Sequence, residues 1–193
     1  MSASDGCLVE PLAVAVHGIR RGGVRPTDRV AVIGGGTIGQ MASVVAQAAG
    51  CAVDLSARHD RQRDAASRLG AGELSGNGYD VVVEAAGTSS ALAEAVDRCR
   101  PGGTVILLGS YWDGNVEMPG MGIGMKEISL IPAVMYGRSG PSRDVDVAAT
   151  ILAQRPDLPG VVITHRFPLD AAREAFDVAS DRSAGAIKVV LEP

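Results

Sequence analysis

The chain has 193 residues, a formal net charge of −4 and an aromatic content of 3%, which allows one sizeable core or at most two domains. The net charge is negative, and the sequence has neither a basic stripe nor an aromatic surface on which bases could stack, so nucleic acid is not expected as a partner. The sequence has no cationic leader and no apolar stretch of about 20 residues, so we expect a cytoplasmic protein with no membrane partner.

The first expected element is a helix near the N-terminus. Four apolar residues recur there at the spacing of one helical face, and a glycine pair at 22–23 ends the pattern. These four residues are Leu8, Leu12, Val16 and Ile19.

From residue 29 onward, continuous apolar runs alternate with segments of helical periodicity. This alternation is typical of a parallel sheet that helices cover on both faces, so we expect an α/β fold, a Rossmann doubly wound parallel sheet of about six strands. The stretch 71–78 is too short for a full helix, which predicts a stunted third strand, and 109–127 is expected to be a loop. The expected strands are 29–33, 52–57, 80–85, 104–108, 128–135, 161–164 and 186–191, and the expected helices are 37–49, 60–69, 89–99, 143–154 and 169–179.

The strongest motif is a glycine turn between the first strand and the helix that follows it. Gly34, Gly36 and Gly39 stand in the spacing G-x-G-x-x-G directly after an apolar strand. In such a turn the first glycine makes the tight bend, the second lets the backbone approach a pyrophosphate, and the third lets helix and strand pack closely. Thr37 and Ile38 open the helix, whose free N–H groups suit an anion. We therefore predict a dinucleotide site at these five residues.

The end of the second strand indicates which dinucleotide is bound. An NAD site has an acidic residue there, but this sequence has Ala57, eighteen residues after the last glycine, followed by Arg58. An arginine can bind a 2′-phosphate through two parallel hydrogen bonds, so NADP(H) is favoured and NAD(H) is the alternative. Arg63, one turn further on, is assigned to the same site, although Arg61 and Arg63 also fit a solvated helix start. If the strand ended earlier, Asp54 could take the acidic role.

Seven segments in order along the chain resemble one family. The chain resembles the C-terminal, cofactor-binding half of medium-chain zinc-type alcohol and polyol dehydrogenases, a group that includes sorbitol, threonine and butanediol dehydrogenases. The segments are 9–17 (VEPLAVAVH), 32–39 (VIGGGTIG), 69–71 (LGA), 80–87 (DVVVEAAG), 100–103 (RPGG), 167–169 (FPL) and 185–190 (GAIKVV).

The resemblance implies an NADP(H)-binding domain of an oxidoreductase that transfers hydride between a nicotinamide and an alcohol or carbonyl. It implies that residues 1–24 form a crossover helix and that 25–193 form the Rossmann domain. It also assigns further cofactor contacts at the carboxyl ends of the later strands. These contacts are Ala86, Gly87, Leu108, Gly109 and Val134.

Members of this family carry zinc in an N-terminal catalytic barrel, which this sequence does not include. Glu10 matches the family's glutamate that faces zinc, so it is a metal ligand only if a catalytic domain is supplied. We therefore assign no catalytic residue, expect zinc only in a full-length enzyme, and expect the isolated chain to be inactive. The alternatives are a stand-alone or partner-dependent nucleotide-binding module, and a metal-free reductase with Tyr111 or Tyr136 as proton donor.

Two further expectations concern the middle of the sheet and its edge. Glu84 would be a costly buried charge unless a helix end or a ribose provides a hydrogen bond. Residues 128–136 resemble the family's edge strand, through which two cofactor domains pair, so a homodimer is expected.

Overall fold

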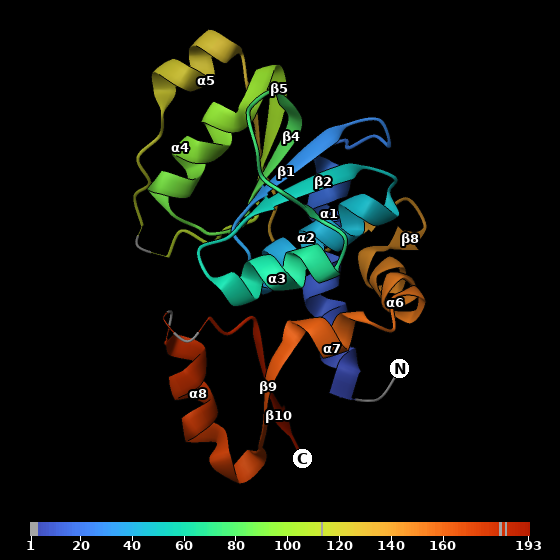
Figure 1. The fold of residues 1–193 in the computed structure, drawn as a ribbon. Helices are drawn as coiled ribbons and strands as arrows, with labels where there is room; N and C mark the ends of the chain where they lie inside the picture. Colours follow the sequence, from blue (N-terminus) through green and yellow to red (C-terminus); the bar gives the residue numbers. More distant parts are fainter. Residues whose placement is uncertain (1–3, 113, 182, 184) are drawn as a thin grey trace.

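The computed structural model describes residues 4–112, 114–181, 183 and 185–193, and it is built around a six-stranded parallel sheet (Figure 1). The strand order is β3-β2-β1-β4-β5-β6, which confirms the expected doubly wound Rossmann arrangement. The third strand is two residues long, as expected. The strands are β1 (Arg29–Ile33), β2 (Ala52–Ser56), β3 (Gly72–Glu73), β4 (Tyr79–Glu84), β5 (Cys99–Leu107) and β6 (Ser129–Pro132).

Helices cover both faces of the sheet because the buried strands are apolar on both sides. In β1, Val30 and Val32 face one hydrophobic core, whereas Ala31 and Ile33 face the other. The first core is shared with α1, α2 and α6, and the second with α4. Among the described residues, no helix has the length and apolar character that crossing a membrane requires. The helices are α1 (Val9–Arg21), α2 (Thr37–Ala48), α3 (Asp60–Arg68), α4 (Ser89–Arg98), α5 (Gly120–Lys126), α6 (Asp144–Gln154), α7 (Leu158–Val162) and α8 (Ala172–Ser180).

The last two long strands do not join the main sheet. β9 (Ile163–Pro168) and β10 (Lys188–Glu192) pair in parallel as a separate sheet, and Figure 1 shows this sheet and α8 projecting beyond the main body. We expected a strand at 161–164, but β9 begins only at Ile163, and residues 161 and 162 belong to α7. The β-branched run starting at Val161 favours a strand, but Pro159 stands at the start of α7, and that helix buries Val161 and Val162.

A helix occupies part of the segment that was expected to be a loop. α5 has the sequence GMGIGMK, whose three glycines disfavour a helix on local grounds. Tertiary contacts stabilise it: the Lys126 ammonium donates to the carbonyl oxygens of Val96, Asp97 and Cys99, where α4 ends. This pairing joins residues about 30 positions apart, so the local sequence pattern did not reveal it.

Two further boundaries of the sheet differ from expectation. β5 begins at Cys99, ahead of the expected strand 104–108, and runs through the Pro-Gly-Gly segment. Gly103 permits this course, since a Cβ there would lie 2.5 Å from the Cys99 sulfur. β6 ends at Pro132, although Ala133 still donates its N–H to the Leu107 carbonyl at 3.1 Å, and a short hairpin of β7 (Arg138–Ser139) and β8 (Ser142–Arg143) follows.

A buried carboxylate joins the N-terminal helix to the later part of the chain. Asp144, at the start of α6, is only 1% exposed and accepts hydrogen bonds from Arg20 at 2.6 Å, His17 at 3.1 Å and the Gly137 backbone N–H at 2.8 Å. Burial raises the pKa of this carboxyl, but the Gly137, Arg20 and His17 hydrogen bonds outweigh burial and hold the pKa below its ordinary value. Asp144 therefore locks α1 against α6.

Asp144→Asn should lower the free energy of unfolding by about 2 kcal/mol at pH 7, because hydrogen bonds to a charged group contribute roughly 1.5–3 kcal/mol. Since the folded-state pKa is depressed, this stabilisation is present above the unfolded value of about 3.9 and is lost as the pH falls through the folded value. Urea unfolding across this range should show the difference between variant and wild type shrinking below about pH 4. Asp146→Asn, which removes an exposed ion pair with Arg143, is the matched control and should change little.

Candidate functional site

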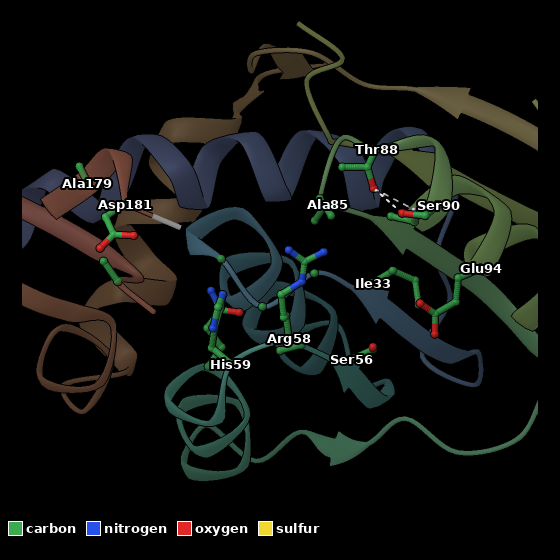
Figure 2. A pocket seen from close by; sticks show the side chains of 18 residues that line it. Ile33, Ser56, Arg58, His59, Ala85, Thr88, Ser90, Glu94, Ala179 and Asp181 are labelled. Carbon is green, nitrogen blue, oxygen red and sulfur yellow. Dashed lines mark hydrogen bonds between the residues drawn. The ribbon is translucent and has the colours of Figure 1, made fainter. Parts of the chain in front are cut away.

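A hollow of about 640 Å³ lies where the main sheet ends, beside the turns that follow β1, β2 and β4 (Figure 2). Ile33, Ser56 and Glu84 are the last residues of these strands and lie in register with one another. In open α/β sheets, ligands bind at this carboxyl edge, at the point where the strand order reverses. The predicted site residues that line the hollow are Gly34, Gly36, Ala57, Arg58 and Ala86.

The glycine turn has the geometry that each of its glycines requires. Gly34 has φ +110° and its N–H donates to the Ser56 carbonyl at 2.9 Å, so it bends the chain and also extends the pairing of β1 with β2. A Cβ at Gly39 would lie 1.8 Å from the Gly34 carbonyl oxygen, which shows how closely α2 packs on the turn. A Cβ at Gly36 would meet nothing within 4 Å, since this glycine faces open space.

The N-terminus of α2 borders the hollow. Gly36 is the N-cap residue, and the first turn of this twelve-residue helix carries no acidic side chain. Its unpaired backbone N–H groups and helix dipole therefore favour an anionic group. Thr37 and Ile38 do not line the hollow: Thr37 donates its hydroxyl to the Ile187 carbonyl, and Ile38 packs against the first core.

The sequence analysis gave no role to two residues that shape the glycine turn, Gly35 within it and Gln40 in α2. Gln40 is fully buried and its amide nitrogen donates to the carbonyl oxygens of Gly35 at 3.1 Å and Gln62 at 2.9 Å. It therefore ties the glycine turn to α3. A Cβ at Gly35 would lie 2.4 Å from the Ala57 Cβ, so the middle glycine is also required. A polar residue within the apolar stretch of α2 was the available signal for Gln40.

The segment after β2 presents one arginine to the hollow and uses another to brace the backbone. Arg58 is exposed, and Figure 2 shows its side chain extending toward the Ala85 side of the pocket. Arg63 instead donates to the carbonyl oxygens of Ala57 at 2.8 Å and Arg58 at 2.9 Å and pairs with Asp60. The structure therefore brings Arg58 to the hollow and places Arg63 behind it.

Asp54, the alternative residue for reading a ribose, lies in the middle of β2. Its Oδ2 accepts the Tyr79 hydroxyl at 2.7 Å, and its Oδ1 packs so closely on Gly72 that a Cβ there would lie 2.2 Å away. These contacts hold the carboxylate between Gly72 of β3 and the Tyr79 hydroxyl. Asp54 is not among the residues that line the hollow.

Glu84 has partners that the sequence did not identify. Its Oε1 accepts the backbone N–H groups of Ala86 at 2.8 Å and Gly87 at 2.7 Å, and its Oε2 accepts the Tyr111 hydroxyl at 2.7 Å. Burial, the hydrogen bond to Glu84 and the charge of Glu84 all raise the pKa of Tyr111 above its ordinary value. A phenol held in this way is a poor proton donor, which argues against the metal-free reductase with Tyr111 as the acid.

The remaining predicted contacts lie toward β5 and β6, outside the hollow. Leu108 packs into the first core against Gly18, where a Cβ would lie 2.8 Å from its side chain, so only its backbone is available. Gly109 donates its N–H to the Glu84 carbonyl at 2.9 Å. The Val134 side chain is 78% exposed, two residues beyond the end of β6.

The residues considered as metal ligands do not converge. Glu10 is exposed in the first turn of α1, and His17 is engaged with Asp144. Among the described residues, no group of three or more His, Cys, Asp or Glu side chains is placed to hold a metal ion.

A glycine turn at the carboxyl edge of a doubly wound sheet, with an arginine at the end of β2, defines the class of dinucleotide-binding domains. The family described as Glucose dehydrogenase C-terminus matches residues 3–192, and the chain belongs to this family. Sorbitol dehydrogenase from Macaca fascicularis is 32% identical over 192 residues, covering 90% of this chain and 52% of the relative. The chain thus spans about half the length of this curated relative.

Solved structures agree with this assignment. A candidate zinc-binding dehydrogenase from Sinorhizobium meliloti 1021, solved with NADP bound, has a TM-score of 0.79 and 27% identity over 98% of this chain and 59% of that protein. Galactitol-1-phosphate dehydrogenase from Escherichia coli has a TM-score of 0.87 over 100% of this chain and 61% of its own, at 24% identity, which shows the fold alone.

Two alanine variants should separate the structural and the binding roles of the glycine turn. Gly39→Ala forces a methyl against the Gly34 carbonyl and should lower the free energy of unfolding by about 3 kcal/mol, at the upper end of overpacking costs. Gly36→Ala adds its methyl to open space, so it should remain folded while losing affinity for NADPH. Thermal unfolding and NADPH fluorescence titration measure the two effects. A Gly36→Ala protein that binds NADPH as wild type does would contradict the assignment.

Proposed function

We propose that this chain is the NADP(H)-binding domain of a medium-chain alcohol or polyol dehydrogenase. Residues 1–24 lead into the domain and residues 25–193 form it. The observation that supports this most directly is the hollow that Gly36, Ala57 and Arg58 line together, because it combines an anion-binding helix terminus with a free cation at the ribose position. The NADP-bound relative supports the same class of ligand.

The preference for a 2′-phosphate rests on the positive charge of Arg58 and on the lack of a carboxylate at position 57. Ala57 has no carboxylate to accept a 2′-hydroxyl or to repel a phosphate, and Arg58 follows it on the exposed side of the hollow. Asp54 lies in the middle of β2 and does not line the hollow. A guanidinium can donate two parallel hydrogen bonds to a phosphate, so NADP(H) is proposed over NAD(H).

The residues of this chain bind and orient the cofactor, whose nicotinamide supplies the hydride when it is bound. Backbone groups of Gly34, Gly36 and α2 would receive the pyrophosphate, and the ends of β4, β5 and β6 would face the nicotinamide half through Gly87, Gly109 and Val134. We assign zinc, and the proton transfer to substrate, to a catalytic domain of the whole enzyme, toward which Glu10 would point. For this chain alone, nucleotide binding without turnover is the proposed activity.

We also propose a homodimer through the segment 128–136. β6 is the edge strand of the main sheet, beside β5, so one side of its backbone is available to a second copy. Exposed apolar side chains at Val134 and Met135 continue this edge beyond the strand. Pairing two edges would extend the sheet across both copies and cover an exposed backbone.

Arg58→Ala should weaken NADPH binding by about tenfold to a hundredfold and leave NADH binding nearly unchanged, because a charge-assisted contact to phosphate contributes roughly 1.5–3 kcal/mol. Calorimetric titration of both nucleotides against wild type and variant measures this. Arg68→Ala, an exposed arginine of α3 that does not line the hollow, is the control and should leave both affinities unchanged. Equal binding of NADPH and NADH by the wild type would overturn the NADP assignment.

Sedimentation velocity should show the 19.7 kDa chain as a dimer that dissociates on dilution. Ile131→Lys places a charge on the β6 edge and should shift the protein to monomer at concentrations where the wild type is dimeric. Leu169→Lys, an exposed leucine before α8, is the matched control and should not change the mass. A wild type that remains monomeric at every concentration would contradict the dimer.

A further inference from the structure

Glu84 is a fully buried carboxylate at the point where the strand order reverses. It ends β4, which lies between β1 and β5 in the sheet. Its two oxygens serve different loops: Oε1 accepts the backbone N–H groups of Ala86 and Gly87, and Oε2 accepts the Tyr111 hydroxyl. Three donors to one buried carboxylate form strong, charge-assisted hydrogen bonds, so the charge is stabilised where it stands.

The loops that Glu84 joins are in close contact around it. Gly87 has φ +70°, and a Cβ there would lie 2.6 Å from the Ser110 carbonyl oxygen. A Cβ at Gly109 would lie 2.4 Å from Glu84 Oε2 and 2.4 Å from the Gly87 nitrogen. There is no room for a methyl group on either side, so the position of one loop fixes the position of the other.

These two loops lie on the side of the sheet that the proposed function assigns to the nicotinamide. Arg58 follows β2, which places the adenosine half over β1 and β2. A dinucleotide straddles the switch point between β1 and β4, so its second half extends over β4 and β5. The loops after these strands are the ones that Glu84 and Tyr111 hold together.

We propose that Glu84 and Tyr111 are positioning residues that preset the loops after β4 and β5 for the nicotinamide half of the cofactor. This inference rests on the proposed function. Glu84 is enclosed by its own loops and acts through the Ala86 and Gly87 N–H groups, not by contact with the ligand. A carboxylate suits this role because it accepts from every donor around it, which holds the loops in one arrangement before the ligand arrives.

The chain offers a matched control for the tyrosine. Tyr79, at the opposite end of β4, donates its hydroxyl to Asp54 at 2.7 Å, the same distance as from Tyr111 to Glu84. Tyr79→Phe and Tyr111→Phe therefore each remove a tyrosine–carboxylate hydrogen bond, one at each end of β4, and Tyr79→Phe also removes the contacts of its hydroxyl with the Ser75 backbone. Glu84→Gln keeps the shape of the side chain and an acceptor for the Ala86 and Gly87 N–H groups, but it turns an amide donor toward Tyr111.

Calorimetric titrations of the whole chain with NADPH and with adenosine 2′,5′-bisphosphate, which lacks the nicotinamide half, test the proposal. Tyr111→Phe and Glu84→Gln should each weaken NADPH binding by about tenfold and change binding of the bisphosphate less than about twofold. Tyr79→Phe should change neither affinity. In thermal unfolding it should lose at least as much stability as Tyr111→Phe does, so a loss of stability alone would not account for weaker binding by Tyr111→Phe.

The other possible outcomes distinguish a failure of the positioning role from a failure of the proposed NADP(H)-binding function. Folded Tyr111→Phe protein that binds NADPH as the wild type does overturns the positioning role and leaves the proposed function intact. Equal losses for NADPH and the bisphosphate overturn the assignment to the nicotinamide side. A wild-type chain that binds neither ligand overturns the proposed function itself. If Glu84→Gln does not fold, Tyr111→Phe with its Tyr79→Phe control gives the answer alone.

Discussion

The close approach of α2 to the end of β1 is the constraint on which the rest of the site depends. Gly39 lies against the Gly34 carbonyl with no space for a side chain, so the first turn of α2 begins where β1 ends. The same Gly34 continues the pairing with β2 through Ser56 and lies against Ala86 after β4, where a Cβ would be 3.0 Å from the Ala86 nitrogen. One contact between a helix and a strand thereby sets the ends of three strands around a single hollow.

Buried polar groups then fix the loops that the sheet alone would leave free. Gln40 holds the glycine turn to α3, and Glu84 holds the loops after β4 and β5. Each group makes hydrogen bonds in a low-dielectric interior, where such bonds are strong and a missing partner is costly. Stability and pre-organisation of the site therefore depend on the same interactions.

The parts of the fold that the sequence predicted are those with a local signal. The strand, turn and helix from Arg29 to Ala48 follow from apolar periodicity and glycine spacing, and Ala57 with Arg58 follows from counting along the next strand. Partners distant in the sequence could not be found in this way. The Lys126 contacts that stabilise α5 are one case, and the pairing of β9 with β10 outside the main sheet is another, because periodicity shows that a segment is a strand but not which sheet it joins. Arg63 was assigned on its charge, yet the backbone of the preceding turn engages it.

The anchoring of α1 by Asp144 also affects the order in which the chain can fold during its synthesis. Arg20 and Asp144 are 124 residues apart, and a ribosome that adds about 5–20 residues per second needs roughly 6–25 s to cover that interval. Until then α1 has no α6 to pack against, and one apolar face of the first helix remains uncovered in the nascent chain. The contact between α1 and α6 therefore forms late, so the growing polypeptide exposes this apolar face to aggregation and chaperone capture while the sheet itself is being made.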